Sequence, residues 1–339
     1  MSIEDITGGP PRPAPRGAGA VAARLTNVTR GFRVTALRDY GIVLSFVVLF
    51  LTLTFASDVF LTKTNLLNIL DQTAPVGIMA VGGTLVFIAG GFDLSVGAVF
   101  AISSVIAAQS VPHIGPGWAL VLGALSGFAF GAANGFLVNV ARINAFIATL
   151  GSAIMLRGLA LVMTGGLLIT VTEPSYSNFG RGDWLGVKYG VWTWLFFALV
   201  AGFLLSRTTL GRYIYASGGN PEAARLSGIR VGLVRTITFL ISGFSASIAG
   251  ILVGSRVATG QAAAGLGIEF TVIAGIVIGG ISIFGGEGAI WRSILGVLLL
   301  TMIGNGFVLM NIQPIYTQII QGAIILLAVA IDSWSRRSS

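Results

Sequence analysis

Gly218–Ile229, with the sequence GGNPEAARLSGI, is a polar segment in a chain that is apolar on both sides of it. Asn220 suits an N-cap position, and Pro221 suits the first position of a helix, where a missing N–H costs nothing. Glu222 would lie in the first turn, where the helix dipole favours an anion. Gly228 follows about two turns later, where a glycine commonly ends a helix. The segment therefore predicts a short helix with a defined start and a defined end.

A helix this short is marginal in water by itself, so we expect it to dock on another molecule. Two interpretations of Glu222 stay open. It contacts the partner, or it only complements its own helix dipole, and then Ala223, Ala224 and Leu226 form the packing face. The candidate contact residues are Asn220, Pro221, Glu222, Ala223, Ala224, Arg225, Leu226 and Gly228.

Composition places the chain in a membrane. Of its 339 residues, 55% are hydrophobic and 9% are charged, and the mean hydropathy is +0.91, whereas soluble domains are about 25% charged. The net charge of +8 is explained by the positive-inside bias of membrane proteins rather than by nucleic-acid binding. The absence of Cys excludes disulfides, and the single His, His113, lies in a loop-like stretch and disfavours a metal site.

Ten apolar runs are long enough to be spans, for which about 17–25 residues are needed. Residues 1–36 precede them and are rich in Pro and Gly, so they predict a disordered tail. The predicted all-α membrane domain covers residues 37–335, and a second short tail covers 336–339. The predicted spans are 40–57, 74–90, 93–111, 118–140, 145–165, 190–206, 235–254, 269–284, 289–310 and 314–331. One long broken span over 74–111 is the alternative to the second and third.

The distribution of Lys and Arg predicts the orientation. With the N-terminus in the cytoplasm, 15 of the 20 basic residues lie on the cytoplasmic side, which is the side that loops rich in Lys and Arg prefer. An even number of spans returns the C-terminus to the same side. The predicted location is a plasma membrane with both termini cytoplasmic, and the polar segment then lies in a cytoplasmic loop, 207–235.

A glycine recurs at every fourth position of the predicted span 118–140. Such a stripe indicates close helix–helix packing, with a wall of the solute path as the alternative. The glycines are Gly123, Gly127, Gly131 and Gly135.

No enzyme motif is apparent. A P-loop needs a lysine after its second glycine, and neither of the two lysines, Lys63 and Lys188, has that context. No nucleophile–base arrangement or metal-ligand cluster is seen, so we expect neither catalysis nor a cofactor.

Few ionisable residues lie within the spans, which disfavours an ion-coupled carrier. Asp93 follows Gly90-Gly91, where it would cap a helix or anchor a gate. Arg157 lies mid-span, where it would pair with a carboxylate or extend to the membrane surface, and Glu269 begins a span. The candidate residues for a solute path or gate are Asp93, Ser95, Asn134, Asn139 and Asn305; the asparagines could equally bond neighbouring helices.

Several segments resemble the ribose-type permeases, the membrane subunits of bacterial ATP-binding-cassette (ABC) importers of simple sugars. Gly90–Gly97, GGFDLSVG, is similar to their Gly-Gly-Ile-Asp-Leu-Ser-Val-Gly signature, with Phe92 in place of Ile. The order Glu222-Ala223-Ala224-x-x-x-Gly228 is similar to the coupling-helix motif of importer permeases generally. The resemblance extends over roughly residues 40–335, and its other segments are Asn65–Thr73, Phe146–Gly151, Arg157–Gly166, Gly211–Ile229, Gly279–Trp291 and Gly322–Asp332.

The resemblance implies a fold like that of type II ABC importers and a role in importing a monosaccharide or similar polyol. It also implies a cytoplasmic ABC ATPase that docks on 220–228, an extracytoplasmic sugar-binding protein, a second permease copy or paralogue, and surrounding membrane lipid. Two alternatives remain: a related permease for branched-chain amino acids or nucleosides, and a carrier driven by a proton or sodium gradient.

Overall fold

The computed structural model describes residues 41–313, together with residues 315, 316, 319, 322, 323 and 326. The chain divides into two units, Met1–Gly41 and Ile42–Ser339, and the second unit contains the membrane helices. The predicted tails, 1–36 and 336–339, and most of the predicted span 314–331 lie outside the described residues.

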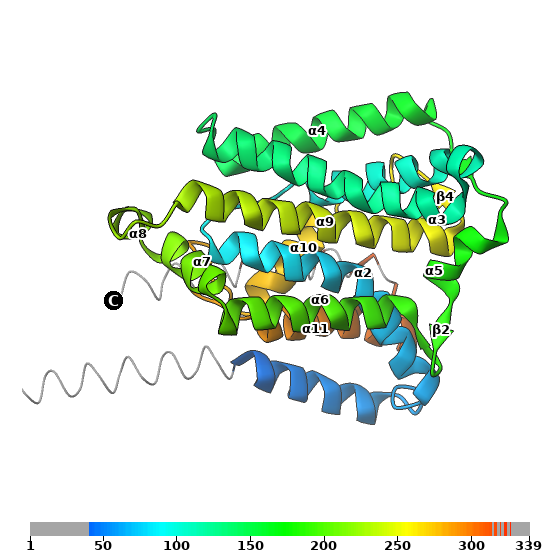
Figure 1. The fold of residues 1–339 in the computed structure, drawn as a ribbon. Coiled ribbons are helices and arrows are strands. Elements are labelled where there is room, and N and C mark those ends of the chain that lie inside the picture. The colour runs from blue at the N-terminus through cyan, green and yellow to red at the C-terminus, as the bar shows by residue number, and fades with distance from the viewer. Residues whose placement is uncertain (1–40, 314, 317–318, 320–321, 324–325, 327–339) are drawn as a thin grey trace, which may run out of the picture. The chain divides into compact units, whose positions relative to one another are not determined.

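Helices make up most of the described part of the chain, as the sequence predicts. Six are long and apolar enough to cross a membrane, and Figure 1 shows them lying side by side along a common direction. They are α2 (Lys63–Ile88), α3 (Val96–Asn139), α4 (Ala145–Thr164), α6 (Tyr189–Arg207), α9 (Val231–Val257) and α11 (Ile290–Leu309). Shorter apolar helices are Gly41–Ala56 and α10 (Ile268–Ile278).

Helix α3 consists of two arms that fold back on each other. Gly115 interrupts it with φ 75° and ψ 162°, between Pro112 and Pro116. The Ser103 and Ser126 hydroxyls lie 2.8 Å apart, so the arms are antiparallel. Two of the predicted spans, 93–111 and 118–140, correspond to these arms.

Three predicted boundaries differ from the observed ones. Helix α2 begins 11 residues before the predicted 74, because its polar residues are bonded inside the protein: Asn65 to Asn305 and Asp71 to Arg256. Helix α9 begins at Val231, so the last residues of the predicted loop 207–235 are helical. Helix α10 ends at Ile278 and not near 284, because a glycine-rich stretch follows, in which Gly280, Gly285, Gly286 and Gly288 have positive φ.

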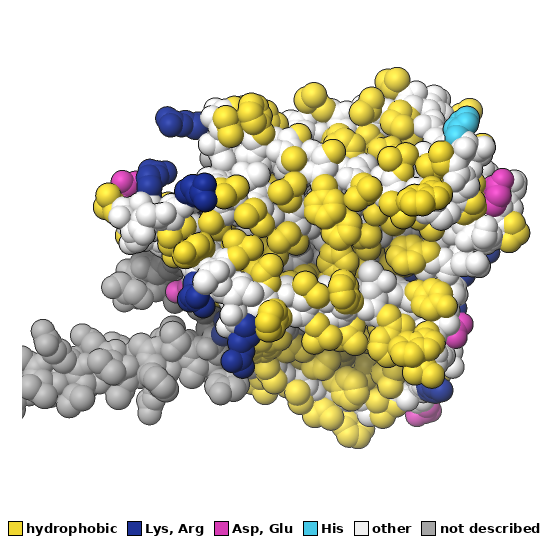
Figure 2. Space-filling model, in the orientation of Figure 1, with side chains coloured by type: hydrophobic (Ala, Val, Ile, Leu, Met, Phe, Trp, Pro, Cys, Tyr) yellow, Lys and Arg dark blue, Asp and Glu magenta, His cyan; other side chains and the backbone are white. Residues whose placement is uncertain are grey.

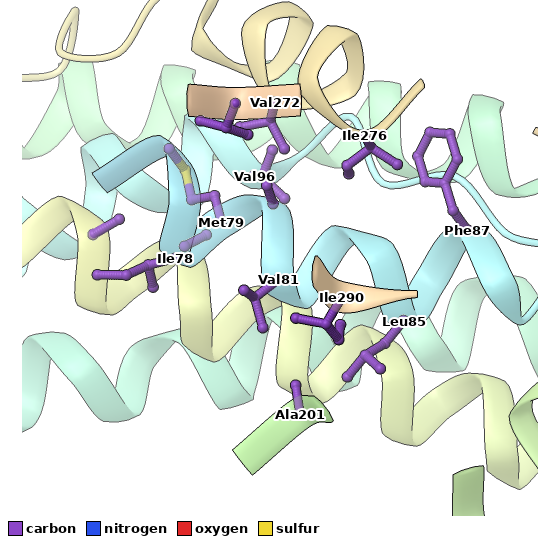
Figure 3. Packing of buried hydrophobic residues seen from close by; sticks show 14 of the residues in the cluster. Ile78, Met79, Val81, Leu85, Phe87, Val96, Ala201, Val272, Ile276 and Ile290 are labelled. Atoms are coloured by element: carbon purple, nitrogen blue, oxygen red, sulfur yellow. The ribbon is translucent and has the colours of Figure 1, made fainter. Parts of the chain in front are cut away.

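Helix α2 is the centre of the core. In the most apolar 18-residue stretch of α2, 78% is buried inside the protein, whereas the corresponding share is 17% for α4 and 22% for α6. Figure 3 shows Ile78, Met79, Val81, Leu85 and Phe87 of this helix among side chains from the helices around it. Helices α4 and α6 instead expose most of their apolar surface, as lipid-facing helices do. The surrounding side chains labelled there are Val96, Ala201, Val272, Ile276 and Ile290.

The glycine stripe packs against α9, which confirms the packing interpretation. A Cβ on Gly127 would overlap the Gly243 carbonyl and Ser247, and one on Gly131 would overlap the Phe239 carbonyl. The second arm of α3 and α9 therefore touch backbone to backbone along the stripe.

Helix α10 crosses only part of the distance that its neighbours cross. Residues 261–267 before it are not helical, and they run beside the first arm of α3: a Cβ on Gly265 would lie 2.8 Å from the Phe100 ring. Arg157 of α4 donates to the carbonyls of Ala262, Ala264 and Gly265, each at 3.1 Å. Arg157 thus does not extend outward. It forms no direct ion pair with a carboxylate, although Glu269 is near enough to interact with it electrostatically, and its hydrogen bonds go to the carbonyls of this non-helical stretch.

Short elements close the end of the bundle opposite α8 (Pro221–Leu226) (Figure 1). Tyr176 is fully buried there, and the Ser255 hydroxyl, in the last turn of α9, donates to its carbonyl at 2.6 Å. The elements are β1 (Ile169–Thr170), paired with β4 (Thr259–Gly260); η1 (Pro174–Ser177); α5 (Asn178–Arg181); and the hairpin of β2 (Asp183–Trp184) and β3 (Val187–Lys188).

Replacing Gly131 by alanine should destabilise the bundle. The added methyl group would force α3 and α9 apart, an overpacking effect of about 1–3 kcal/mol. Thermal unfolding of the purified chain in detergent measures it. Gly151→Ala on α4 is the control, because a Cβ there meets nothing within 4 Å; equal stability of the two variants would contradict close α3–α9 packing.

Candidate functional site

The polar segment that the sequence singles out forms helix α8, with the predicted caps. Asn220 is the N-cap, and its side chain accepts the N–H of Ala223 at 2.9 Å. Pro221 is the first helical residue. Gly228 has φ 84°, and the next N–H, of Ile229, donates back to the Ala224 carbonyl at 3.0 Å. The predicted local structure is confirmed from start to end.

The side chains of α8 divide into an inner and an outer set. Ala224 is buried against the protein, so it cannot belong to an outward packing face, whereas Leu226 is 82% exposed. Glu222 and Arg225 form an exposed ion pair at 3.0 Å. An exposed leucine beside an exposed ion pair leaves the helix with a surface that a partner could cover.

A second helix, α7 (Thr209–Gly219), precedes α8, and sequence reasoning missed it. Thr208 caps it by accepting the N–H of Gly211 at 3.1 Å. Its inner side is formed by Gly211, Ile214, Ser217 and Gly218, which are buried. The threonine followed by small and apolar residues at helical spacing was the available signal; the short length and three glycines obscured it.

The end of α7 lies directly against two loops that are far away in sequence. A Cβ on Gly218 would overlap the Ile88 carbonyl and lie 2.6 Å from the Gly286 nitrogen. One on Gly285 would lie 2.8 Å from the Gly90 Cα. We call this contact of residues 88–90, 218–219 and 285–286 the glycine junction. It is tied by the Gly286 N–H, which donates to the Ile88 carbonyl at 2.8 Å.

Arg235 of α9 bridges two of the three segments. Its Nε donates to the Ala89 carbonyl at 2.9 Å, and its Nη2 donates to the Ser217 carbonyl at 3.2 Å. The first carbonyl ends α2 and the second lies in the last turn of α7. The sequence had indicated only that Arg235 is one of many cytoplasmic cations.

Asp93 lies just beyond the junction in a buried polar cluster. One carboxylate oxygen accepts the Ser95 hydroxyl at 2.6 Å and the Ser95 N–H at 3.0 Å. The other accepts the Ser242 hydroxyl of α9 at 2.7 Å. Asn134 donates to the Ser95 hydroxyl at 2.7 Å, and its own Oδ1 is buried without a partner. Three of the five candidate path residues are therefore brought together.

The cap expected of Asp93 is only partly present. The N-cap of α3 is Ser95, which makes no side-chain capping bond; Asp93 accepts the N–H of Ser95 and otherwise bonds hydroxyls. Thr149 of α4 supports the same loop by accepting the Leu94 N–H at 3.1 Å. The loop between α2 and α3 is thus held by side chains from several helices.

The other two candidate path residues bond neighbouring helices. Asn139 donates to the Thr236 hydroxyl of α9 at 3.1 Å. Asn305 and Asn65 exchange amide hydrogen bonds of 2.8 and 3.2 Å between α11 and α2. Their packing role, left open by the sequence, is sufficient to explain them.

A cavity of about 520 Å³ adjoins the Asp93 loop. Its wall includes Gly91 and Phe92 of that loop, Asn144 and Phe146 at the start of α4, and Arg235. The cavity therefore touches both the glycine junction, at Gly90, and the residues of the loop that directly precede Asp93.

Charges are unequal at the two ends of the bundle. Figure 2 shows Lys and Arg gathered at the end that carries α8. Among the described residues that end has seven arginines (Arg142, Arg207, Arg212, Arg225, Arg230, Arg235 and Arg292) and three carboxylates (Asp93, Glu222 and Glu287). The opposite end has four cations (Lys63, Arg181, Lys188 and Arg256) and four carboxylates (Asp58, Asp71, Glu173 and Asp183).

Metal binding has no support in the described part of the chain, where no group of three or more His, Cys, Asp or Glu side chains could hold an ion. Glu269 lies at the start of α10, as expected, and its Oε2 is buried beside Gly97. The polar groups of the Asp93 cluster are suited to hydrogen bonding rather than to catalysis.

Replacing Ser242 by alanine should destabilise the chain by about 1–3 kcal/mol, because one oxygen of the buried Asp93 would lose its hydrogen bond. Thermal unfolding of the purified chain measures the loss. Ser206→Ala is the matched control, because that hydroxyl is exposed and bonds only its own helix. A Ser242→Ala variant as stable as Ser206→Ala would contradict the cluster.

Comparison with known proteins agrees with the resemblance found in the sequence. Residues 65–329 match the family described as branched-chain amino acid transport system / permease component. The chain is 40% identical over 309 residues to the ribose import permease protein RbsC of Escherichia coli K12, covering 90% of this chain and 96% of that protein.

Two further relatives have the same character. The ribose import permease protein RbsC of Bacillus subtilis is 36% identical, covering 87% of this chain and 93% of that protein. The L-arabinose ABC transporter permease protein AraH of Azospirillum brasilense is 35% identical, covering 87% and 88%. No solved structure matches. These relatives are membrane permeases and not enzymes, and the chain belongs to their family, the permease subunits of ABC importers.

Proposed function

We propose that this chain is the transmembrane subunit of an importer that moves a monosaccharide or similar polyol across the bacterial plasma membrane, driven by a separate cytoplasmic ATPase. The observation that carries the proposal is α8, a capped and exposed helix at the basic end of the bundle. The chain has no P-loop of its own, so ATP must act through a partner, and α8 offers that partner a surface.

The charge distribution supports an orientation with α8 in the cytoplasm. The end that carries α8 has an excess of four positive charges among the described residues, and the opposite end has none. Loops on the cytoplasmic side are enriched in Lys and Arg. We infer ten spans with both termini cytoplasmic, in a fold like that of type II importers; the two arms of α3, the two shorter apolar helices and residues 314–331 complete that number.

Sugar is the solute that the relatives favour. The names of the relatives specify ribose and L-arabinose, whereas the name of the family specifies branched-chain amino acids. Identity of 35–40% over most of the chain is the more specific guide. We therefore propose a sugar-binding protein on the side opposite α8 as the second partner.

The cluster of Asp93, Ser95 and Asn134 is our candidate for a gate on the solute path. It is buried and hydrogen-bonded, and the loop residues directly before Asp93 line a cavity of about 520 Å³ next to the glycine junction. Asn139 and Asn305 are explained by helix packing and are left out of this proposal.

A second permease copy or a paralogue would complete the transport unit. Helix α4 contacts the rest of the chain mainly through α3 and exposes large apolar side chains. Among them are Ile147, Ile154, Met155 and Val162, each more than 60% exposed. Lipid or a second subunit must cover them.

Transport by the reconstituted importer tests the function. The chain is placed in proteoliposomes with its ATPase and binding protein, and uptake of labelled D-ribose and L-arabinose is measured with and without ATP. We expect uptake that needs ATP and is not reduced by excess leucine. Uptake without any ATPase that follows a proton or sodium gradient would overturn the proposal in favour of a secondary carrier, and leucine competition would favour the amino-acid alternative.

Changing Leu226 to aspartate tests the docking surface. Because this side chain is 82% exposed, the variant should fold; we expect at least a tenfold weaker association with the ATPase. Copurification from membranes measures it. Leu185→Asp is the control, since Leu185 is 76% exposed in the hairpin at the opposite end. If the two variants associate equally well with the ATPase, α8 is not the docking helix.

A further inference from the structure

The glycine junction lies between the proposed docking helix, α8, and the proposed gate at Asp93. The proposed function does not by itself explain how a movement of α8 reaches that gate. Helix α8 follows α7 after a single residue, Asn220, which ends one helix and caps the next. The last residues of α7 touch the end of α2, and the chain reaches Asp93 within a few residues of that contact. A movement of α8 therefore has a short route to the buried cluster.

The junction is suited to transmitting movement because backbone meets backbone in it. A Cβ on Gly286 would lie 2.6 Å from the Gly219 Cα, and one on Gly285 would lie 2.8 Å from the Gly90 Cα. Side chains can absorb a displacement by changing rotamer, but no side chains separate these segments. A shift of one segment must then push the next.

Steric contact transmits a movement only when one segment approaches the other. The hydrogen bonds of Arg235 also keep the segments together when one of them moves away. Its guanidinium holds the Ala89 carbonyl at 2.9 Å and the Ser217 carbonyl at 3.2 Å. Both carbonyls lie at the C-terminal ends of helices, where the helix dipole is negative and a cation is favoured. One rigid fork of donors therefore fastens the ends of α2 and α7 to each other and to α9.

A further hydrogen bond connects α7 to the stretch between α10 and α11. The Tyr215 hydroxyl of α7 donates to the Gly288 carbonyl at 2.7 Å. Burial raises the pKa of this hydroxyl above its usual value, so the donor proton is retained throughout the physiological range. Helix α7 is thus bonded directly to the stretch between α10 and α11, and through Arg235 to the end of α2.

We propose that Arg235 is a positioning residue that makes α7, and with it α8, move as one body with residues 89–95, so that docking-helix motion displaces Asp93. The proposal rests on the proposed function. Residues 89–95 contain no regular helix and can change conformation more easily than the helices that flank them. Their displacement would disturb the Asp93 bonds to Ser242 and reshape the adjacent cavity.

Arg235→Ala and Arg235→Gln test this in the complete importer, reconstituted in proteoliposomes. Three quantities are measured: copurification of the ATPase, ATP hydrolysis stimulated by the sugar-loaded binding protein, and sugar transported per ATP hydrolysed. We expect normal copurification and at least a fivefold loss of sugar transported per ATP. This ratio is counted per functioning complex, so a reduced amount of folded protein would not change it.

Arg207→Ala is the charge-matched control, because Arg207 is an exposed arginine at the same end of the bundle. It should keep the wild-type ratio. An unchanged ratio in both Arg235 variants would overturn the proposal, as would loss of ATPase association together with transport, since Arg235 would then act in docking.

A glycine pair gives an independent test if the Arg235 variants do not fold. Gly218→Ala adds a methyl group where it must displace the Ile88 carbonyl, whereas at Gly202 on α6 a Cβ meets nothing within 4 Å. We expect Gly218→Ala to lower the ratio of sugar to ATP and Gly202→Ala to leave it unchanged. Tyr215→Phe, which removes only one hydroxyl, should lower the ratio less than Gly218→Ala does; wild-type ratios in both Gly218→Ala and Tyr215→Phe would overturn the proposal.

Failure of this inference is distinguishable from failure of the proposed function. If the wild-type chain does not associate with an ATPase or does not transport sugar with ATP, the proposed function fails. If the wild-type chain does both and the junction variants behave like their controls, only the inference about Arg235 and the junction fails.

Discussion

Close approach of backbones, made possible by glycine, is the interaction on which this structure depends. Inside a bilayer, helices gain little from the hydrophobic effect when they associate, because lipid is as apolar as their own side chains. What remains is van der Waals contact at short range, together with hydrogen bonds. The stripe of α3 against α9 and the junction at the end of α7 both use this contact. The first holds two long helices together, and the second joins three segments that are distant in sequence.

Polar groups in the interior must be hydrogen-bonded within the protein, because no water is present there to bond a buried donor or acceptor. Arg157 bonds three carbonyls of the non-helical stretch before α10, and Arg235 bonds two carbonyls at helix ends. Asn65 and Asn305 satisfy each other. In this chain arginine and asparagine therefore serve as internal connections, and their positions mark places where the regular helical pattern is interrupted.

The sequence predicted features that depend on local chemistry and missed those that depend on distant contacts. Caps, apolar runs and the glycine spacing act within a few residues, so α8, most spans and the α3 stripe could be inferred. The early start of α2 could not, because the polar residues in its first turns find partners on α11 and α9. The junction was equally hidden: Gly90, Gly218 and Gly285 each look like ordinary turn or helix-end glycines until the fold brings them together. Asp93, Ser95 and Asn134 could be named from polarity alone, but Ser242 could not, since a serine in an apolar helix carries no distinctive signal.

Helix α10 has 11 residues, about 16 Å at 1.5 Å per residue, and so covers about half of the roughly 30 Å hydrocarbon core of a bilayer. During synthesis such a segment cannot enter the membrane as an independent helix, and the non-helical residues before it carry carbonyls that lipid cannot satisfy. The first arm of α3 and Arg157 of α4 are made earlier and can provide those partners. The order in which the ribosome delivers the chain is therefore part of what allows this region to insert: its supports are already in the membrane when it emerges.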